Sequence, residues 1–186
     1  MSIGARNNNS ILMVVIAAVL MAQPLHAETE GLDRQFGELA DPGYAGWSRA
    51  ESEIRMAWSR SGSAPMDLLL KRGEDALDAG DPAAAVEHLT ALTDHAPDFP
   101  EGWNARATAY AMSGEYGPAV ADLRRVLSLE PRHWGALSTL GGLLDEMDDK
   151  PRALAAFRAS FALNPHQQDV KDAIVRLEKE LSGVAL

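Results

Sequence analysis

Between residues 66 and 165 the sequence repeats itself with a period of 34 residues. Pro97, Pro131 and Pro165 lie 34 residues apart, and three further columns keep the same interval. These columns are Leu69, Trp103 and Leu137; Gly73, Ala107 and Gly141; and Ala85, Ala119 and Ala153. Four columns in one register indicate a chain built from stacked copies of one small unit, each of which buries its apolar face against its neighbours.

The spacing within each unit is typical of α-helices. Leu69, Gly73 and Ala76 are separated by four and then three residues, which places them on one face of a helix. The small residue in the middle lets a second helix approach closely, and Ala85 is the reciprocal small position on that second helix. No strand-like run of alternating β-branched residues follows residue 28, so the pattern predicts an all-α fold.

Helix ends are marked by glycine and proline. Gly80 and Gly114 stand where a first helix must end in a left-handed conformation, and Asp148 takes that place in the third unit. The repeated proline closes each second helix because it lacks an amide hydrogen. Each unit is therefore predicted to be helix, turn, helix.

These residues resemble the tetratricopeptide-repeat family. The match is carried by Trp103, Ala107, Tyr110, Ala119 and Pro131. The block as a whole resembles three consecutive repeats, over residues 66–99, 100–133 and 134–167. The first unit departs from the motif, because Leu69 replaces the usual tryptophan and Leu92 a usual alanine. The resemblance implies an all-α, right-handed superhelix.

Segments on both sides of the repeats are also predicted to be helical. Residues 166–186 include an amphipathic stripe suited to a capping helix, made of Val170, Ile174, Leu177 and Leu181. Residues 28–65 contain two helical stretches with Trp47 and Trp58, followed by a linker. Two interpretations of this segment remain open: a helical hairpin packed against the first repeat, or an element for partner docking or self-association.

The first 27 residues have the order of a secretory signal peptide. Arg6 precedes an uninterrupted apolar run at 11–22, Pro24 breaks it, and Ala27 supplies a small residue at the cleavage position. The run is too short to cross a bilayer, which needs about 20 residues. We expect cleavage after Ala27, with an uncleaved anchor as the alternative. The mature protein is expected in the periplasm, without a membrane span.

Composition argues against several functions. The net charge of −10 disfavours nucleic-acid binding, and the densest basic pair, Arg124-Arg125, is flanked by Asp122 as on a solvated helix face. There is no cysteine and no catalytic motif, so we expect neither an enzyme nor a cofactor. His88 with His95 and the acidic run 145–149 lack the ligand patterns of metal and calcium sites.

The resemblance also implies a binding surface, because the first helix of each tetratricopeptide repeat lines a concave groove. The family positions fall on Asp67, Leu70, Glu74, Leu77, Asp78, Glu101, Asn104, Thr108, Met112, Ser138, Asp145 and Glu146. Leu70 and Glu74 stand where relatives that grip a C-terminal carboxylate need lysine and asparagine. The groove is therefore expected to favour a basic or amphipathic segment, with Leu70, Met112 and Phe99 among the apolar contacts.

These observations predict a non-catalytic periplasmic protein–protein interaction module, a scaffold, adaptor or assembly chaperone that binds a peptide or helix. The alternative is a structural subunit of an envelope complex that self-associates through residues 28–60.

Overall fold

The computed structural model describes residues 31–183, which contain nine helices and no strand. Residues 34–186 form one compact unit. The helices are α3 (Asp33–Ala40), α4 (Trp47–Trp58), α5 (Ala64–Asp78), α6 (Pro82–His95), α7 (Pro100–Met112), α8 (Tyr116–Leu129), α9 (Trp134–Glu146), α10 (Lys150–Leu163) and α11 (Gln168–Leu181). The predicted all-α class is confirmed, whereas the predicted signal peptide lies outside the described residues. Of the nine helices, none is long and apolar enough to cross a bilayer.

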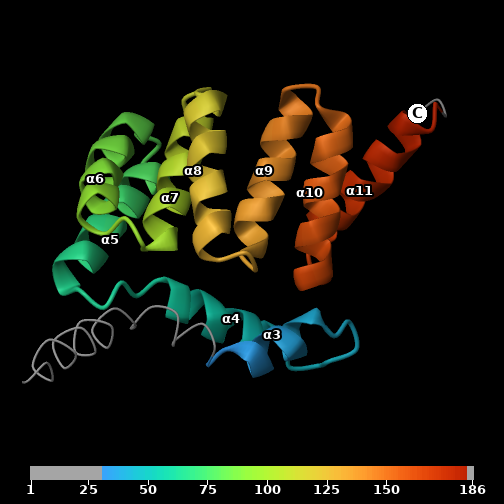
Figure 1. The fold of residues 1–186 in the computed structure, drawn as a ribbon, viewed down its shortest axis with the longest axis horizontal. Coiled ribbons are helices and arrows are strands. Elements are labelled where there is room, and N and C mark those ends of the chain that lie inside the picture. The colour runs from blue at the N-terminus through green and yellow to red at the C-terminus, as the bar shows by residue number, and fades with distance from the viewer. Residues whose placement is uncertain (1–30, 184–186) are drawn as a thin grey trace, which may run out of the picture. The chain divides into compact units, whose positions relative to one another are not determined.

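Helices α5 to α10 form three antiparallel pairs that stack side by side into a superhelix (Figure 1). Small residues set the distance within a pair. A Cβ atom at Gly73 would come within 2.5 Å of the Leu89 side chain, and one at Gly141 within 2.8 Å of the Phe157 ring. Glycine therefore lets the second helix of each pair bury a large side chain directly against the first helix, as the repeat columns predicted.

Two adjacent glycines in α9 provide a test of this packing. Gly141→Ala is expected to lower the free energy of unfolding by up to about 2 kcal/mol, because overpacking against Phe157 outweighs the gain in helix propensity. Gly142→Ala meets nothing within 4 Å and should raise stability by up to about 1 kcal/mol. Urea denaturation of the two variants measures both values, and equal shifts would contradict the close approach.

The turns within the repeats adopt the predicted backbone conformation. Gly80 and Gly114 have φ of 72° and 73°, and Asp148 has φ of 59°. Asp148 is the non-glycine residue with positive φ in the described part of the chain. Aspartate tolerates this region because its short side chain can bond locally. The third repeat therefore keeps the same turn without glycine.

Helix α11 covers the end of the last repeat. Val170 and Leu177 are buried against α9 and α10, and Ile174 is partly buried. Leu181, which the sequence pattern placed on the same stripe, is 45% exposed because it lies at the last residue of the helix. The predicted capping contact is thus made by the first three residues of the stripe.

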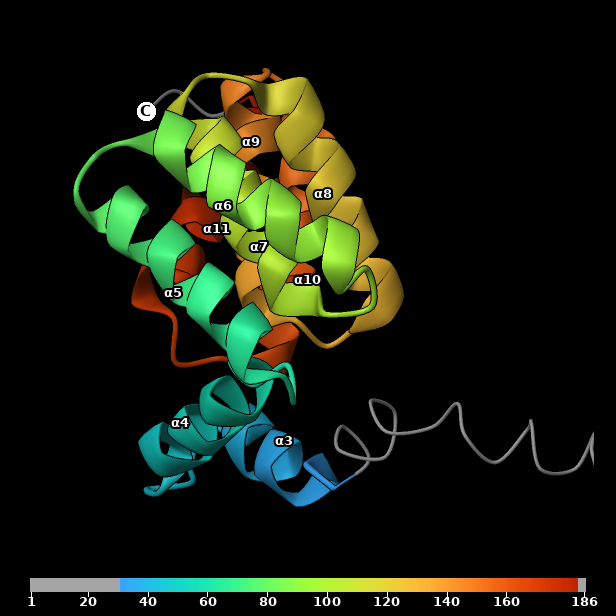
Figure 2. The same ribbon diagram turned by 90° about the vertical axis from the view of Figure 1, so that its left-hand side faces the viewer.

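The N-terminal helices pack mainly on the junctions after the second and third repeats, not on the first repeat as the hairpin interpretation expected. Trp58 stacks on His133 with ring centroids 4.2 Å apart, and Trp47 stacks on His166 at 4.4 Å. Figures 1 and 2 both show α3 and α4 across the ends of the repeat helices. The tryptophans are 11 residues apart, so they share one face of α4 and reach two successive junctions.

Candidate functional site

A pocket of about 400 Å³ opens on the inner face, where the first helices of all three repeats meet. Helices α5, α7 and α9 provide most of its lining, and the end of α4 provides another wall. The lining residues are Arg55, Trp58, Ser59, Glu74, Glu101, Asn104, Thr108, His133, Gly135, Ser138 and Thr139. Its volume is within the range of pockets that bind small molecules or a few side chains.

Glu101 is held in place at the pocket by α7 and α9. His133 Nδ1 accepts a hydrogen bond from the Ala136 amide, 3.0 Å away, and so caps the start of α9. The ring proton is therefore on Nε2, which donates to Glu101 Oε2 at 3.0 Å. Asn104 Nδ2 donates to the other carboxylate oxygen at 2.9 Å.

These contacts change the acidity of Glu101. Burial alone would raise its pKa, but the hydrogen bonds from His133 and Asn104 and the charge of Arg55 outweigh burial and hold the pKa below its usual value. A lowered pKa in the folded state means that the ionised form stabilises the fold above the unfolded pKa. This contribution is lost as the pH falls through the lower, folded value. Glu101 is thus an ionised acceptor at neutral pH.

Glu74 differs from Glu101, because no hydrogen bond or ion pair satisfies it within residues 31–183. Burial raises the pKa of its carboxyl, and the neighbouring charges of Glu101 and Asp78 raise it further, against a smaller opposing effect of Lys71. The ionised form is therefore disfavoured in the folded protein as it stands. A cation beside Glu74 would remove this penalty.

Two hydroxyl groups add further acceptors. Thr108 Oγ1 donates to the Asn104 carbonyl at 3.2 Å, and Ser138 Oγ donates to the Gly135 carbonyl at 2.9 Å. Because each hydroxyl hydrogen is used within its own helix, the oxygen lone pairs are what each side chain can offer to a ligand. The floor of the pocket is consequently rich in acceptors.

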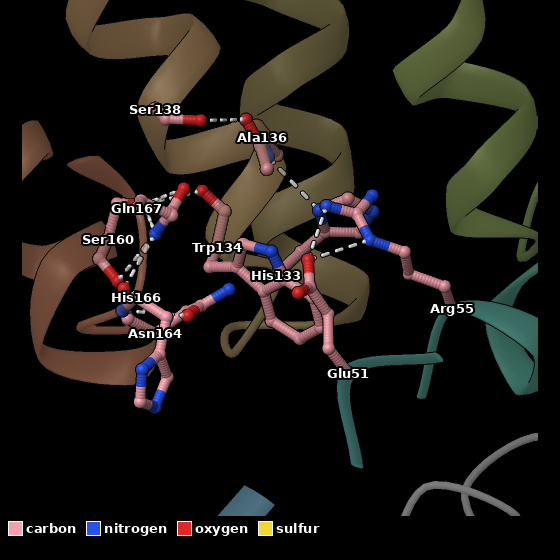
Figure 3. A network of polar contacts seen from close by, with 11 residues as sticks. Glu51, Arg55, His133, Trp134, Ala136, Ser138, Ser160, Asn164, His166 and Gln167 are labelled. Atoms are coloured by element: carbon pink, nitrogen blue, oxygen red, sulfur yellow. Dashed lines mark hydrogen bonds and ion pairs between the residues drawn. The ribbon is translucent and has the colours of Figure 1, made fainter. Parts of the chain in front are cut away.

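The α4 wall carries one cation. Arg55 donates two hydrogen bonds to Glu51, at 3.0 and 2.9 Å, and its guanidinium lies 5.4 Å from the Trp134 ring centroid. Figure 3 shows this pair beside His133 and Trp134. Sequence reasoning missed Arg55, Trp58, Ser59, His133 and Thr139 as pocket residues. The two tryptophans of the segment were the available signal, since a large apolar payload needs a surface on which to pack.

The residues predicted for the groove divide into two sets. Five line the pocket: Glu74, Glu101, Asn104, Thr108 and Ser138. The rest lie elsewhere, and several are engaged in structural contacts. Asp67 accepts from the backbone and hydroxyl of Ser61, Asp145 pairs with Arg176 at 2.5 Å, and Glu146 bonds Tyr116. Leu77 packs against the first core cluster, Asp78 is exposed, and Met112 is 52% exposed.

Two predicted apolar contacts of the groove are wrong. Leu70 is 3% exposed and Phe99 is 4% exposed, and both belong to the core shared by α5, α6 and α7. Their burial follows from the helical phase, which turns Leu70 toward the second helix of its own pair. In the part of the chain that the structure describes, no three His, Asp or Glu side chains are placed to hold a metal ion.

Stacked helix pairs, a covered end and an acceptor-lined pocket on the inner face define a helical-repeat protein. Residues 70–131 match the family model for the tetratricopeptide repeat. A TPR repeat-containing protein of Rhizobium etli is 32% identical over 155 residues, covering 82% of this chain and 75% of the relative. The chain belongs to the tetratricopeptide-repeat family, and it is a protein-interaction module.

Two further comparisons are consistent with this assignment. The bovine SGT1 homologue is 31% identical over 115 residues, which are 62% of this chain but only 34% of that protein. The first TPR domain of Spaghetti (RPAP3), solved with an HSP90 peptide, superposes with a TM-score of 0.62 at 19% identity. That match covers 64% of this chain and 95% of the other. At this identity the likeness extends to the fold alone.

Proposed function

We propose that this protein is a non-catalytic scaffold or assembly chaperone, which holds a basic or amphipathic segment of a partner polypeptide on its inner face. The observation that carries this proposal is the pocket built by all three repeats. Helices α5, α7 and α9 contribute two carboxylates to its lining and no basic side chain. Such a surface favours a cationic guest and disfavours an anionic one.

The charge pattern distinguishes this protein from the relative that was solved with an HSP90 peptide. Glu74 lies in the pocket, at a position where carboxylate-gripping relatives are expected to need a polar or basic residue. An acidic C-terminal peptide would therefore meet repulsion instead of paired donors. We expect no binding of that peptide to this chain.

Site-specific photocrosslinking in the native host tests the proposal. A photoreactive residue at Met112, exposed at the end of α7, should capture a partner, whereas one at Ala121, exposed on α8 of the second repeat, should not. The captured protein, once purified, is expected to bind at least tenfold more weakly to a Glu74→Lys variant because its basic segment then meets a cation. Tighter binding to that variant would end the proposal of a basic guest.

The periplasm is the proposed location, supported by the order of charge, apolar run and small residue in 1–27. Sequencing the N-terminus of the exported protein should give Glu28 as its first residue. A full-length chain retained in the membrane fraction would support the uncleaved anchor instead.

Self-association through residues 28–60 is the alternative function. Within residues 31–60 the large apolar side chains mostly pack inside the unit: Phe36, Leu39, Ile54 and Trp58 are buried, and Trp47 stacks on His166. This leaves little apolar surface for a second copy. Sedimentation should accordingly give one mass over a wide range of protein concentration.

A further inference from the structure

The pocket has a definite charge and donor inventory, and this inventory identifies what it can hold. Its ionised lining residues are Glu74, Glu101 and Arg55, and with His133 in its neutral form they leave a formal charge of −1. One cationic group is therefore enough to neutralise the site. A second would restore an excess charge of opposite sign.

The donors that line the pocket are already in use. Arg55 is bound to Glu51 by two hydrogen bonds, and the Nε2 proton of His133 is given to Glu101. The hydroxyl hydrogens of Thr108 and Ser138 go to backbone carbonyls. What these groups leave for a ligand is a set of oxygen acceptors, carried by three different helices.

We propose that this pocket receives the guanidinium group of a single arginine side chain from the partner polypeptide. The acceptors lie on α5, α7 and α9, so a ligand that satisfies several of them needs donors that point in several directions. Guanidinium has five N–H donors in a fixed plane, whereas an ammonium group has three donors on one atom. This inference rests on the proposed function and names the chemistry that its site recognises.

Helix α4 is part of the site and does not only flank it. Arg55, Trp58 and Ser59 form one wall, so the pocket ends at this helix. The guest arginine consequently enters from the open inner face, and the guest chain lies over α5 and α7. The raised pKa of Glu74 agrees with a carboxyl that lacks its cationic partner in the free protein.

An NMR titration of the full mature chain tests the assignment. The probe is an acetyl- and amide-blocked hexapeptide of glycine and serine with one central arginine. It is expected to shift the backbone amide signals of Thr108, Ser138 and Thr139. The citrulline peptide, equal in shape but uncharged, should bind at least tenfold more weakly, and the lysine peptide several-fold more weakly.

Adjacent carboxylates on α5 provide a matched pair of variants. Glu74→Gln should weaken binding of the arginine peptide about tenfold, because it removes the unpaired pocket carboxylate. Asp75→Asn removes the same charge one residue away, where Asp75 is paired with Lys71 at 2.8 Å, and should change binding less than twofold. Arg55→Gln should strengthen binding because it removes a like charge from the wall.

Each contrary result has its own meaning. Equal binding of the citrulline or lysine peptide overturns the arginine assignment, and so does an equal effect of Glu74→Gln and Asp75→Asn. Free arginine amide binding as tightly as the peptide would indicate a small-molecule ligand and overturn the polypeptide guest. Peptide binding that shifts signals around Met112 alone sinks the pocket but leaves the proposed function standing. A captured partner indifferent to Glu74→Lys sinks the proposal of a basic guest, and this inference with it.

Discussion

Replacing Asp122 with alanine is expected to lower the free energy of unfolding by about 3–5 kcal/mol, because it leaves a buried arginine without its counter-ion. Arg106 on α7 makes two hydrogen bonds to Asp122 on α8, at 2.7 and 3.0 Å. Their side chains are only 13% and 7% exposed. The bond to Asp122 raises the pKa of the Arg106 guanidinium further above its ordinary value, and that ordinary value already keeps it charged at neutral pH.

The remaining contacts of Arg106 do not compensate for this loss. Thr93 Oγ1 accepts a hydrogen bond from the guanidinium at 2.9 Å, and the Trp103 ring centroid lies 4.8 Å from it. Both contacts are neutral, so neither replaces the lost counter-charge. Since α7 also carries Glu101, Asn104 and Thr108, the ion pair fixes the helix that contributes most to the pocket.

Urea denaturation measures the effect, and a second ion pair provides the control. Asp98→Ala removes an exposed pair with Arg125, 2.9 Å long, and should cost less than about 1 kcal/mol. The double variant Arg106→Met with Asp122→Leu should recover most of the stability, because apolar residues can replace a buried pair. If Asp122→Ala cost no more than Asp98→Ala, the pair would have to be accessible to water.

Asp122 also shows where sequence reasoning failed. Its place beside Arg124-Arg125 suggested a solvated face, but α8 turns Asp122 inward while Arg125 reaches out to Asp98 and the Pro97 carbonyl. The partner of Asp122 lies 16 residues earlier, on another helix, and one sequence offers no sign of such a pairing. The spacing of apolar residues does not reveal which charged residue is turned inward.

The repeats were predictable because their packing is local and recurs. Gly73 and Leu89 belong to the same unit, and the same relation returns at Gly141 and Phe157, so each column confirmed the others. A departure from the columns was also accommodated locally. Ser160 replaces the apolar residues of its column, is fully buried, and donates to the Trp134 carbonyl at 2.8 Å.

The pocket was predicted only in part, for a related reason. Glu74, Glu101 and Ser138 lie at positions that every repeat offers to the inner face, so the family resemblance located them. The α4 wall has no counterpart in the repeat. Its position depends on contacts such as Trp58 with His133, which are 75 residues apart in sequence, and no period in the chain encodes them.

Trp58 is therefore the residue on which the α4 wall depends, and Trp58→Ala is expected to cost about 3–5 kcal/mol. The indole is 9% exposed and stacks on His133 at an interplanar angle of 8°. Its ring centroid also lies 4.5 Å from that of Trp134 and 6.0 Å from that of Phe36. Without it, α4 loses its main contact with the junction between the second and third repeats.

Much of this loss should appear as local opening of the N-terminal helices. The three core clusters of the repeats contain neither Trp58 nor Phe36, so the repeats keep their own packing when α4 is released. Amide hydrogen exchange should accelerate in α3 and α4 and change little around Leu123 in α8. Binding of the arginine peptide should weaken as well, since the pocket then lacks one wall.

Two substitutions on the same helix control for effects of mutation as such. Met56→Ala changes a side chain that is 49% exposed and should leave exchange in α4 unaltered. Trp58→Phe keeps an aromatic ring on His133 and removes a buried indole N–H that has no acceptor within residues 31–183, so it should cost much less than alanine. Exchange that accelerated equally in α4 and α8 would mean that the N-terminal helices and the repeats unfold as a single unit.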